Sequence, residues 1–137
     1  ADDVGPCDVL TSAEIGAELG GTFGAGASTA DNEVLCEFRS GPPSKYFSVI
    51  LHAESKKGSK SYIDLLQAGE HASERAPAPK KKMKIRYFAP DSEYAEKLAV
   101  LDRKYGYVLT YIDHSNRTSV NRDALLSLAG TVSDRLP

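Results

Sequence analysis

The sequence predicts an α+β fold, in which an antiparallel sheet of about five or six strands packs with N-terminal, middle and C-terminal helices. Five segments alternate apolar and polar residues as half-buried strands do, and three others carry apolar residues at helical spacing. Short turn sequences join neighbouring strand segments, which is typical of antiparallel pairing. The chain has 137 residues, so we expect a single domain over residues 1–137.

The N-terminal helix is predicted over residues 12–19. Thr11 is followed three residues later by Glu14, which is the spacing of a capping box, and Leu10 and Ile15 occupy the positions of a hydrophobic staple. Gly20-Gly21 then ends the helix. The small residues of 20–32 predict a loop with room for a short strand. No strand precedes this loop and no Gly-Lys-Ser/Thr ending follows, so a phosphate-binding loop is not predicted.

The strand pattern begins with Cys36 and Phe38 on one face and Glu37 and Arg39 on the other. The turn sequence Gly41-Pro42-Pro43 joins this segment to the next, and the two are expected to form an antiparallel hairpin. A second hairpin is predicted around Gly106. The five predicted strands are 34–39, 46–53, 83–88, 98–101 and 107–112.

Two more helices complete the predicted fold. The segment from Ser59 to about Ser73 carries apolar residues at helical spacing and is expected to lie on the sheet. The C-terminal helix is expected to be capped by Ser119 or Asn121. Its apolar stripe consists of Val120, Ala124, Leu125, Leu128, Ala129, Val132 and Leu136.

The chain has two cysteines, Cys7 before a helix start and Cys36 within a strand pattern. This arrangement indicates a disulfide that ties the N-terminal helix to the sheet, with two reduced cytoplasmic thiols as the alternative. The chain begins at Ala1, which is consistent with a mature form left after removal of an export signal. We therefore expect a secreted, periplasmic or cell-envelope protein.

Composition excludes several classes of protein. The net charge is −2 from 17 basic and 19 acidic residues, and 41% of the residues are hydrophobic, which is ordinary for a globular protein. No run approaches the ~20 apolar residues that a membrane-spanning helix needs, so no transmembrane segment is expected. The basic run lacks interleaved aromatic residues, so a nucleic-acid partner is not expected.

The densest charge run supplies the candidate binding surface. Lys80, Lys81, Lys82, Lys84 and Arg86 would attract an anionic lipid, a cell-wall polymer or an acidic protein. The alternative interpretation is a solvated loop whose charges protect an edge strand from aggregation. Tyr105 and Tyr107, beside the predicted hairpin turn, are expected to be exposed and to add contacts, because tyrosine has an apolar ring and a polar tip.

The sequence contains no recognisable catalytic motif. It has no Gly-x-Ser-x-Gly segment, and a disulfide would remove both cysteines as nucleophiles. His52, His71 and His114 do not share a spacing that would build a metal site. We expect no catalytic residue, no metal and no cofactor.

Four short motifs run through nearly the whole chain. They are Pro6-Cys7-Asp8-Val9-Leu10-Thr11 with Glu14 and Gly20, Cys36-Glu37-Phe38, Lys104-Tyr105-Gly106-Tyr107-Val108, and the closing helix from Leu125-Leu126 to Arg135-Leu136. Together they resemble a family of small actinobacterial secreted proteins and lipoproteins of unknown function with a PsbP-like α/β sandwich. The resemblance implies an exported protein in which Cys7 and Cys36 are paired.

The predicted function is therefore a non-enzymatic, exported binding or interaction module of the bacterial cell envelope. Its partner, whether a protein, a cell-wall component or a lipid, is open, and so is its oligomeric state. The alternative is a carrier of a small apolar or amphipathic ligand in a pocket between the sheet and the helices, and a third candidate is a hydrolase with no recognisable motif.

Overall fold

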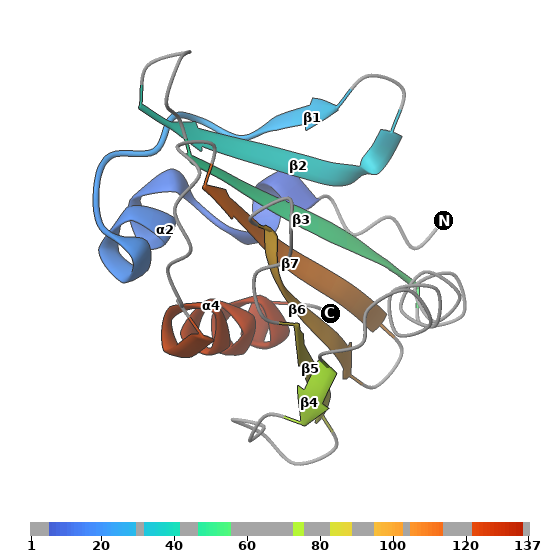
Figure 1. Ribbon diagram of the computed structural model, residues 1–137. Helices are drawn as coiled ribbons and strands as arrows, with labels where there is room; N and C mark the ends of the chain where they lie inside the picture. Colours follow the sequence, from blue (N-terminus) through green and yellow to red (C-terminus); the bar gives the residue numbers. More distant parts are fainter. Residues whose placement is uncertain are drawn as a thin grey trace.

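An antiparallel sheet forms the centre of the molecule (Figure 1). The structure is a computed structural model that describes residues 6–29, 32–41, 47–55, 73–75, 83–88, 95–102, 105–113 and 122–135. Seven strands lie in the order β1-β2-β3-β7-β6-β5-β4, and every neighbouring pair is antiparallel. The strands are β1 (Ala27–Thr29), β2 (Asn32–Ser40), β3 (Phe47–Ser55), β4 (Ser73–Arg75), β5 (Met83–Phe88), β6 (Ala95–Asp102) and β7 (Tyr105–Asp113). The predicted α+β class with an antiparallel sheet is confirmed.

The five longer strands, β2, β3, β5, β6 and β7, correspond to the five strands predicted from sequence alternation. β5 has the predicted bounds, and β6 begins three residues earlier than predicted, at Ala95. β1 and β4 add a strand of three residues at each edge of the sheet. Both predicted hairpins are present, as the β2–β3 and β6–β7 pairs.

The described helices are α1 (Pro6–Val9), α2 (Ser12–Leu19) and α4 (Arg122–Arg135). α2 has the predicted bounds and the predicted capping box, because the Glu14 amide donates to Thr11 Oγ1 and the Thr11 amide donates to Glu14 Oε1. Gly20 and Gly21 follow it with φ of 84° and 87°, a conformation that favours glycine. α1 was not predicted. Most of the predicted middle helix over 59–73, and both predicted cap residues of the last helix, lie outside the described residues.

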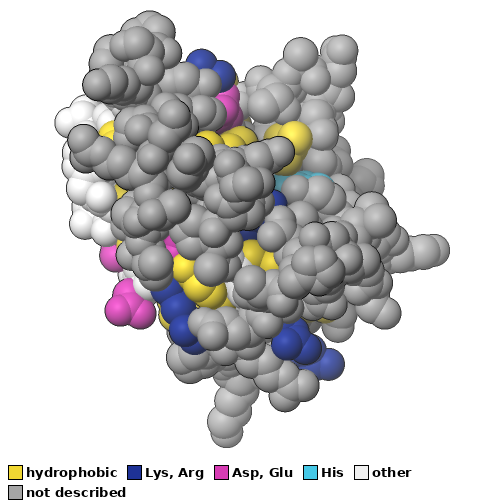
Figure 2. Space-filling model, viewed as in Figure 1, with side chains coloured by type: hydrophobic (Ala, Val, Ile, Leu, Met, Phe, Trp, Pro, Cys, Tyr) yellow, Lys and Arg dark blue, Asp and Glu magenta, His cyan; other side chains and the backbone are white. Residues whose placement is uncertain are grey.

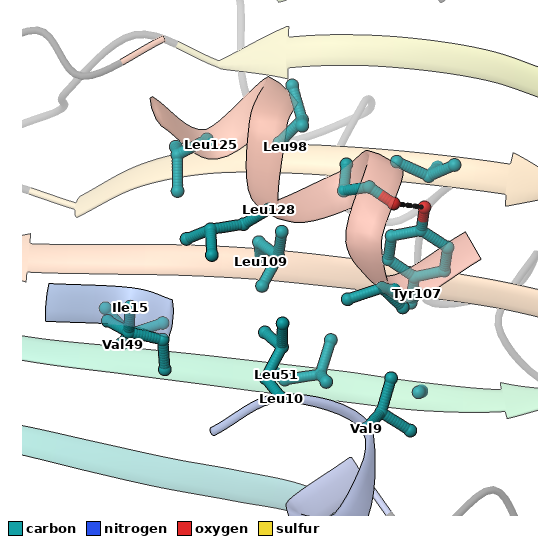
Figure 3. Close-up of a cluster of buried hydrophobic side chains, with 14 of the residues drawn as sticks. Val9, Leu10, Ile15, Val49, Leu51, Leu98, Tyr107, Leu109, Leu125 and Leu128 are labelled. Atoms are coloured by element: carbon teal, nitrogen blue, oxygen red, sulfur yellow. Dashed lines mark hydrogen bonds between the residues drawn. The ribbon is translucent and has the colours of Figure 1, made fainter. Parts of the chain in front are cut away.

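The sheet has a helix face and a second face. The helix face carries Phe38, Leu51, Leu109 and Leu98, which are 0–1% exposed. α1 contacts β2 and β3, α4 contacts β6, and α2 packs against α4. Figure 1 shows α2 and α4 beside one another, and Figure 3 shows the leucines between the strands and α4. Because Leu125 and Leu128 are also at most 1% exposed, leucine side chains fill the described space between the sheet and α4.

Tyr107 provides a polar link inside this apolar layer. Its hydroxyl donates to the Ala129 carbonyl at 2.8 Å and lies 2.5 Å from Ser133 Oγ, which therefore donates to it. Figure 3 shows the ring reaching from β7 to the helix. All three residues are 0% exposed. The link fixes the position of α4 along the sheet, because leaving a buried hydroxyl without its partners costs about 1–3 kcal/mol.

The second face carries a smaller apolar cluster. Phe88, Ala99 and Val108 are 1–2% exposed, and the half-buried Leu101 packs against them. The sheet is therefore apolar on both faces at β5, β6 and β7.

A disulfide joins Cys7 of α1 to Cys36 of β2, with the two Cα atoms 5.2 Å apart. The predicted pairing is confirmed. Gly26 lies against this bond, because a Cβ atom at Gly26 would stand 2.6 Å from both Cys36 Sγ and Phe38 Cε2. The absence of a side chain at Gly26 lets the loop before β1 approach the sulfur atom and the ring.

Glu14 and Arg135 join the start of α2 to the end of α4. Two hydrogen bonds of 2.6 Å run from the Arg135 guanidinium to Glu14 Oε1 and Oε2, and a third of 2.9 Å runs to the Val9 carbonyl. The hydrogen bonds from Arg135 are the largest of the effects that hold the pKa of Glu14 below its usual range. The pair connects elements that are 121 residues apart in the sequence.

The Glu14 pair predicts a dependence of stability on pH. The pKa of Glu14 is lower in the folded state than its unfolded value of 4.5. The contribution of Glu14 to stability is therefore fully present above pH 4.5 and is lost as the pH falls through the folded pKa. Glu14→Gln keeps a capping-box residue but removes the charge. We expect wild type to have the higher melting temperature at pH 7, and the difference to shrink below pH 4.5. A difference that does not change with pH would contradict this role.

Candidate binding face

The candidate site begins with two basic residues of β5. Ile85 and Tyr87 lie on the helix face and are each 4% exposed, so alternation places Lys84 and Arg86 on the second face. Lys84 is exposed and Arg86 is half-buried. The structure thus places these two candidate residues on one face, whereas Lys80, Lys81 and Lys82 lie outside the described residues.

A further basic residue occupies the second face of the adjoining strand. Lys97 of β6 is directly opposite Phe88 of β5 and diagonal to Arg86. We call Lys84, Arg86 and Lys97 the basic face. Among the side chains that the structure describes on β5 and β6, the acidic one, Glu96, is 1% exposed and lies on the helix face, where it pairs in register with Tyr111. The described charges on the second face of these two strands are of one sign.

The basic face borders the apolar cluster of the second face. Arg86 is directly opposite Ala99, and Lys84 is directly opposite Leu101. Figure 2 shows basic, acidic and hydrophobic side chains of the described residues near one another on the lower part of the face in view. The apolar cluster itself is buried, since Phe88, Ala99 and Val108 are only 1–2% exposed, so a ligand would contact the basic side chains and not the cluster.

The predicted tyrosine contacts are wrong. Tyr105 is 4% exposed and Tyr107 is 0% exposed. Both lie on the helix face, opposite Asp102 and Val100 of β6, and Tyr107 points toward α4 (Figure 3). Proximity to a hairpin turn did not expose them, because strand alternation turned both rings into the core.

A buried acidic contact lies on the helix face behind β5 and β6. The Tyr87 hydroxyl donates to Glu96 Oε2, and the Arg122 guanidinium lies 5.3 Å from the centre of the Tyr87 ring. Glu96 is 1% exposed. These contacts attach the first residue of α4 to the sheet, and Glu96 is too deeply buried to contact a ligand on the surface.

The described residues contain no group of three or more His, Cys, Asp or Glu side chains that could hold a metal ion. They do contain a shallow hollow of about 470 Å³ beside α2. The described residues that line it carry no charge and are Ser12, Ala13, Gly16, Ala17, Gly21, Thr22 and Phe23. The basic face is therefore the stronger candidate for a site that recognises a charged ligand.

Lys97 was not among the candidate residues expected from the sequence. The predicted strand began at Leu98, whereas β6 begins at Ala95, so Lys97 was left outside it. The start of β6 does not alternate clearly, because Glu96 lies at a buried helix-face position and Ala95 at a second-face position, so alternation provides no clear signal for Lys97.

Comparisons of the chain with known protein families, with characterised proteins and with solved structures found no match. Fold and site alone therefore define the class: an α+β protein with an antiparallel sheet, a disulfide between α1 and β2, and a basic sheet face. None of the described helices is long and apolar enough to cross a membrane.

Proposed function

We propose that the protein is a non-enzymatic, exported binding module of the bacterial cell envelope that recognises an anionic partner through its basic face. The observation that carries this proposal is the separation of charge in the sheet. Lys84, Arg86 and Lys97 share the second face of β5 and β6, and the side chains described on that face of these two strands include no carboxylate. The chain as a whole has a net charge of −2, so the positive charge of these three residues is a local excess.

The location rests on the disulfide. Cys7 and Cys36 are paired, and disulfides persist outside the reducing cytoplasm. An envelope location also offers anionic partners of the expected classes, namely cell-wall polymers, lipid surfaces and acidic proteins.

The interaction module is favoured over a ligand carrier by the packing of the helix face. A carrier would need an unfilled pocket between the sheet and the helices. In the described part of that layer, Leu98, Leu109, Leu125 and Leu128 are at most 1% exposed and occupy the space. The basic face, in contrast, includes an exposed lysine and a half-buried arginine.

The test measures binding of the oxidised protein to three anionic probes: vesicles that contain an anionic lipid, a soluble anionic glycopolymer and poly-glutamate. We expect at least one probe to bind, with affinity that falls as salt rises because exposed charges are screened. Lys84→Gln with Arg86→Gln should weaken that binding about tenfold or more at low salt.

Arg39→Gln is the matched control, because Arg39 lies on β2 and pairs with Glu37 at 2.9 Å. This variant should bind as the wild type does. Equal binding by the double variant and the wild type, or no binding to any of the three probes, would refute the proposal.

A further inference from the structure

α1 is a short helix that is attached to the sheet by a covalent bond. Its four residues are too few for a helix that is stable on its own. The disulfide joins Cys7 to Cys36 of β2, and Arg135 of α4 donates to the Val9 carbonyl at 2.9 Å. Val9 and Leu10, which are 7% and 1% exposed, complete the attachment. Without the covalent bond, the described contacts that hold α1 are these apolar side chains and this hydrogen bond.

The sheet, α2 and α4 are joined by contacts of their own. The ladders of the sheet run without a break from β2 to β5. Tyr107 links β7 to α4, and the Glu14–Arg135 pair joins α2 to α4. A further hydrogen bond of 2.8 Å runs from the Ser127 hydroxyl of α4 to Glu18 of α2. α1 can therefore move without breaking a strand pair or the contact between α2 and α4.

α1 covers an apolar part of the sheet. It contacts β2 and β3, where Cys36 and its register partner Leu51 are both 0% exposed. Figure 3 shows Leu10 close to Leu51, and both belong to the same buried cluster. A cysteine that is 0% exposed does not react with a reagent in solution until the structure around it opens. The reactivity of a reduced Cys36 thiol would therefore report the opening of this part of the fold.

We infer that the Cys7–Cys36 bond is a redox-controlled latch: its reduction by a dithiol lets α1 open locally from β2 and β3 while the rest of the described fold stays in place. The bond thus decides whether this apolar part of the sheet can become accessible. The latch goes beyond the proposed function, because the basic face lies on the other side of the sheet and uses none of these residues.

The reduction follows the usual course of thiol–disulfide exchange. A thiolate of the dithiol attacks Cys7 Sγ, because Cys36 is 0% exposed whereas Cys7 is half-buried. The S–S bond breaks, and Cys36 leaves as a thiolate that takes up a proton. The second thiol of the reductant then attacks the mixed disulfide and releases Cys7, which is also protonated. Two electrons and two protons pass to the cysteines, and the dithiol becomes a disulfide.

The test measures how fast a small uncharged thiol reagent labels Cys36 in Cys7→Ser, which stands for the reduced state and has Cys36 as its one cysteine. Labelling is followed from no urea to concentrations below the unfolding midpoint. We expect labelling at least tenfold faster than global unfolding of the same variant allows, with little dependence on urea, because opening of α1 exposes little surface. A rate and a urea dependence equal to those of global unfolding would overturn the inference.

Val100→Cys, combined with Cys7→Ser and Cys36→Ala, is the matched control. Val100 is also 0% exposed, but it lies on β6 between Ile85 and Tyr107 of the neighbouring strands. Labelling at this position should follow global unfolding and should depend steeply on urea. If both positions are labelled at the rate that global unfolding of each variant allows, there is no local opening at α1 and the inference fails.

The wild type in dithiothreitol gives a second measurement if Cys7→Ser does not fold. Cys36 of the reduced wild type should be labelled faster than its global unfolding allows, and the oxidised wild type should not be labelled. A reduced wild type without a cooperative urea transition would show that the bond is required by the whole fold, which overturns the latch. Failure of the labelling test leaves the anion-binding proposal in place, and absence of probe binding leaves the latch in place.

Discussion

Removal of the Cys7–Cys36 disulfide is expected to lower the free energy of unfolding by about 3–4 kcal/mol. The bond closes a loop with a sequence separation of 29 residues, and opening that loop gives the unfolded chain more conformational freedom. α1 has four residues and cannot form a stable helix on its own. Its attachment to the sheet therefore depends on this bond and on the buried side chains of Val9 and Leu10, which are 7% and 1% exposed.

Cys7→Ser is the suitable variant, because Cys7 is half-buried whereas Cys36 is 0% exposed and packs against Gly26. It breaks the bond and leaves the buried sulfur atom in place. Urea unfolding with and without reductant measures the effect. The reduced wild type should unfold at nearly the same urea concentration as Cys7→Ser. Reductant should not change the urea midpoint of the variant. Equal midpoints for oxidised and reduced wild type would contradict the expected contribution, and free thiols in the native protein would contradict the pairing.

Local sequence signals predicted the elements whose causes are local. The capping box of Thr11 and Glu14 gave α2 its observed bounds, because those two residues satisfy the first backbone donors of the helix themselves. Alternation gave the bounds of β5, since Ile85 and Tyr87 are buried on one side of the strand. The order of the strands was not predictable in this way. β3 pairs with β7, where Leu51 is opposite Leu109, and no local pattern connects residues so far apart.

The candidate site was predicted only in part, because local patterns place residues of one strand but not residues of neighbouring strands. Lys84 and Arg86 share a strand, so their common face follows from the period of two. Lys97 joins them only through the register of β5 and β6, which the sequence does not state. Tyr107 was assigned to the surface because it lies beside the predicted hairpin turn, and its partners, Ala129 and Ser133, are 22 and 26 residues away along the chain. The hydrogen-bond partners of the Tyr107 hydroxyl are therefore provided by α4, which is distant in the sequence.

Leu109→Ala is expected to lower the free energy of unfolding by about 2–5 kcal/mol, toward the upper end of that range. Leu109 is 0% exposed at the centre of the helix face, directly opposite Leu51 of β3 and Leu98 of β6. Figure 3 shows it between these strands and the leucines of α4. Removal of its side chain leaves a cavity that two neighbouring strands and the Tyr107 link to α4 prevent from closing, so little of the lost contact is regained.

Leu126→Ala is the matched control, because it makes the same chemical change at a half-buried position of α4. Leu126→Ala should lower the free energy of unfolding by about 1 kcal/mol, because the side chain buries less apolar surface and solvent fills the space that it leaves. Chemical unfolding of both variants measures the difference, and binding of the anionic probes provides a second readout. Because the leucine layer and the basic face lie on opposite sides of the sheet, Leu109→Ala should bind those probes as the wild type does while it is folded. Equal costs for the two substitutions would show that α4 is held by contacts other than this layer.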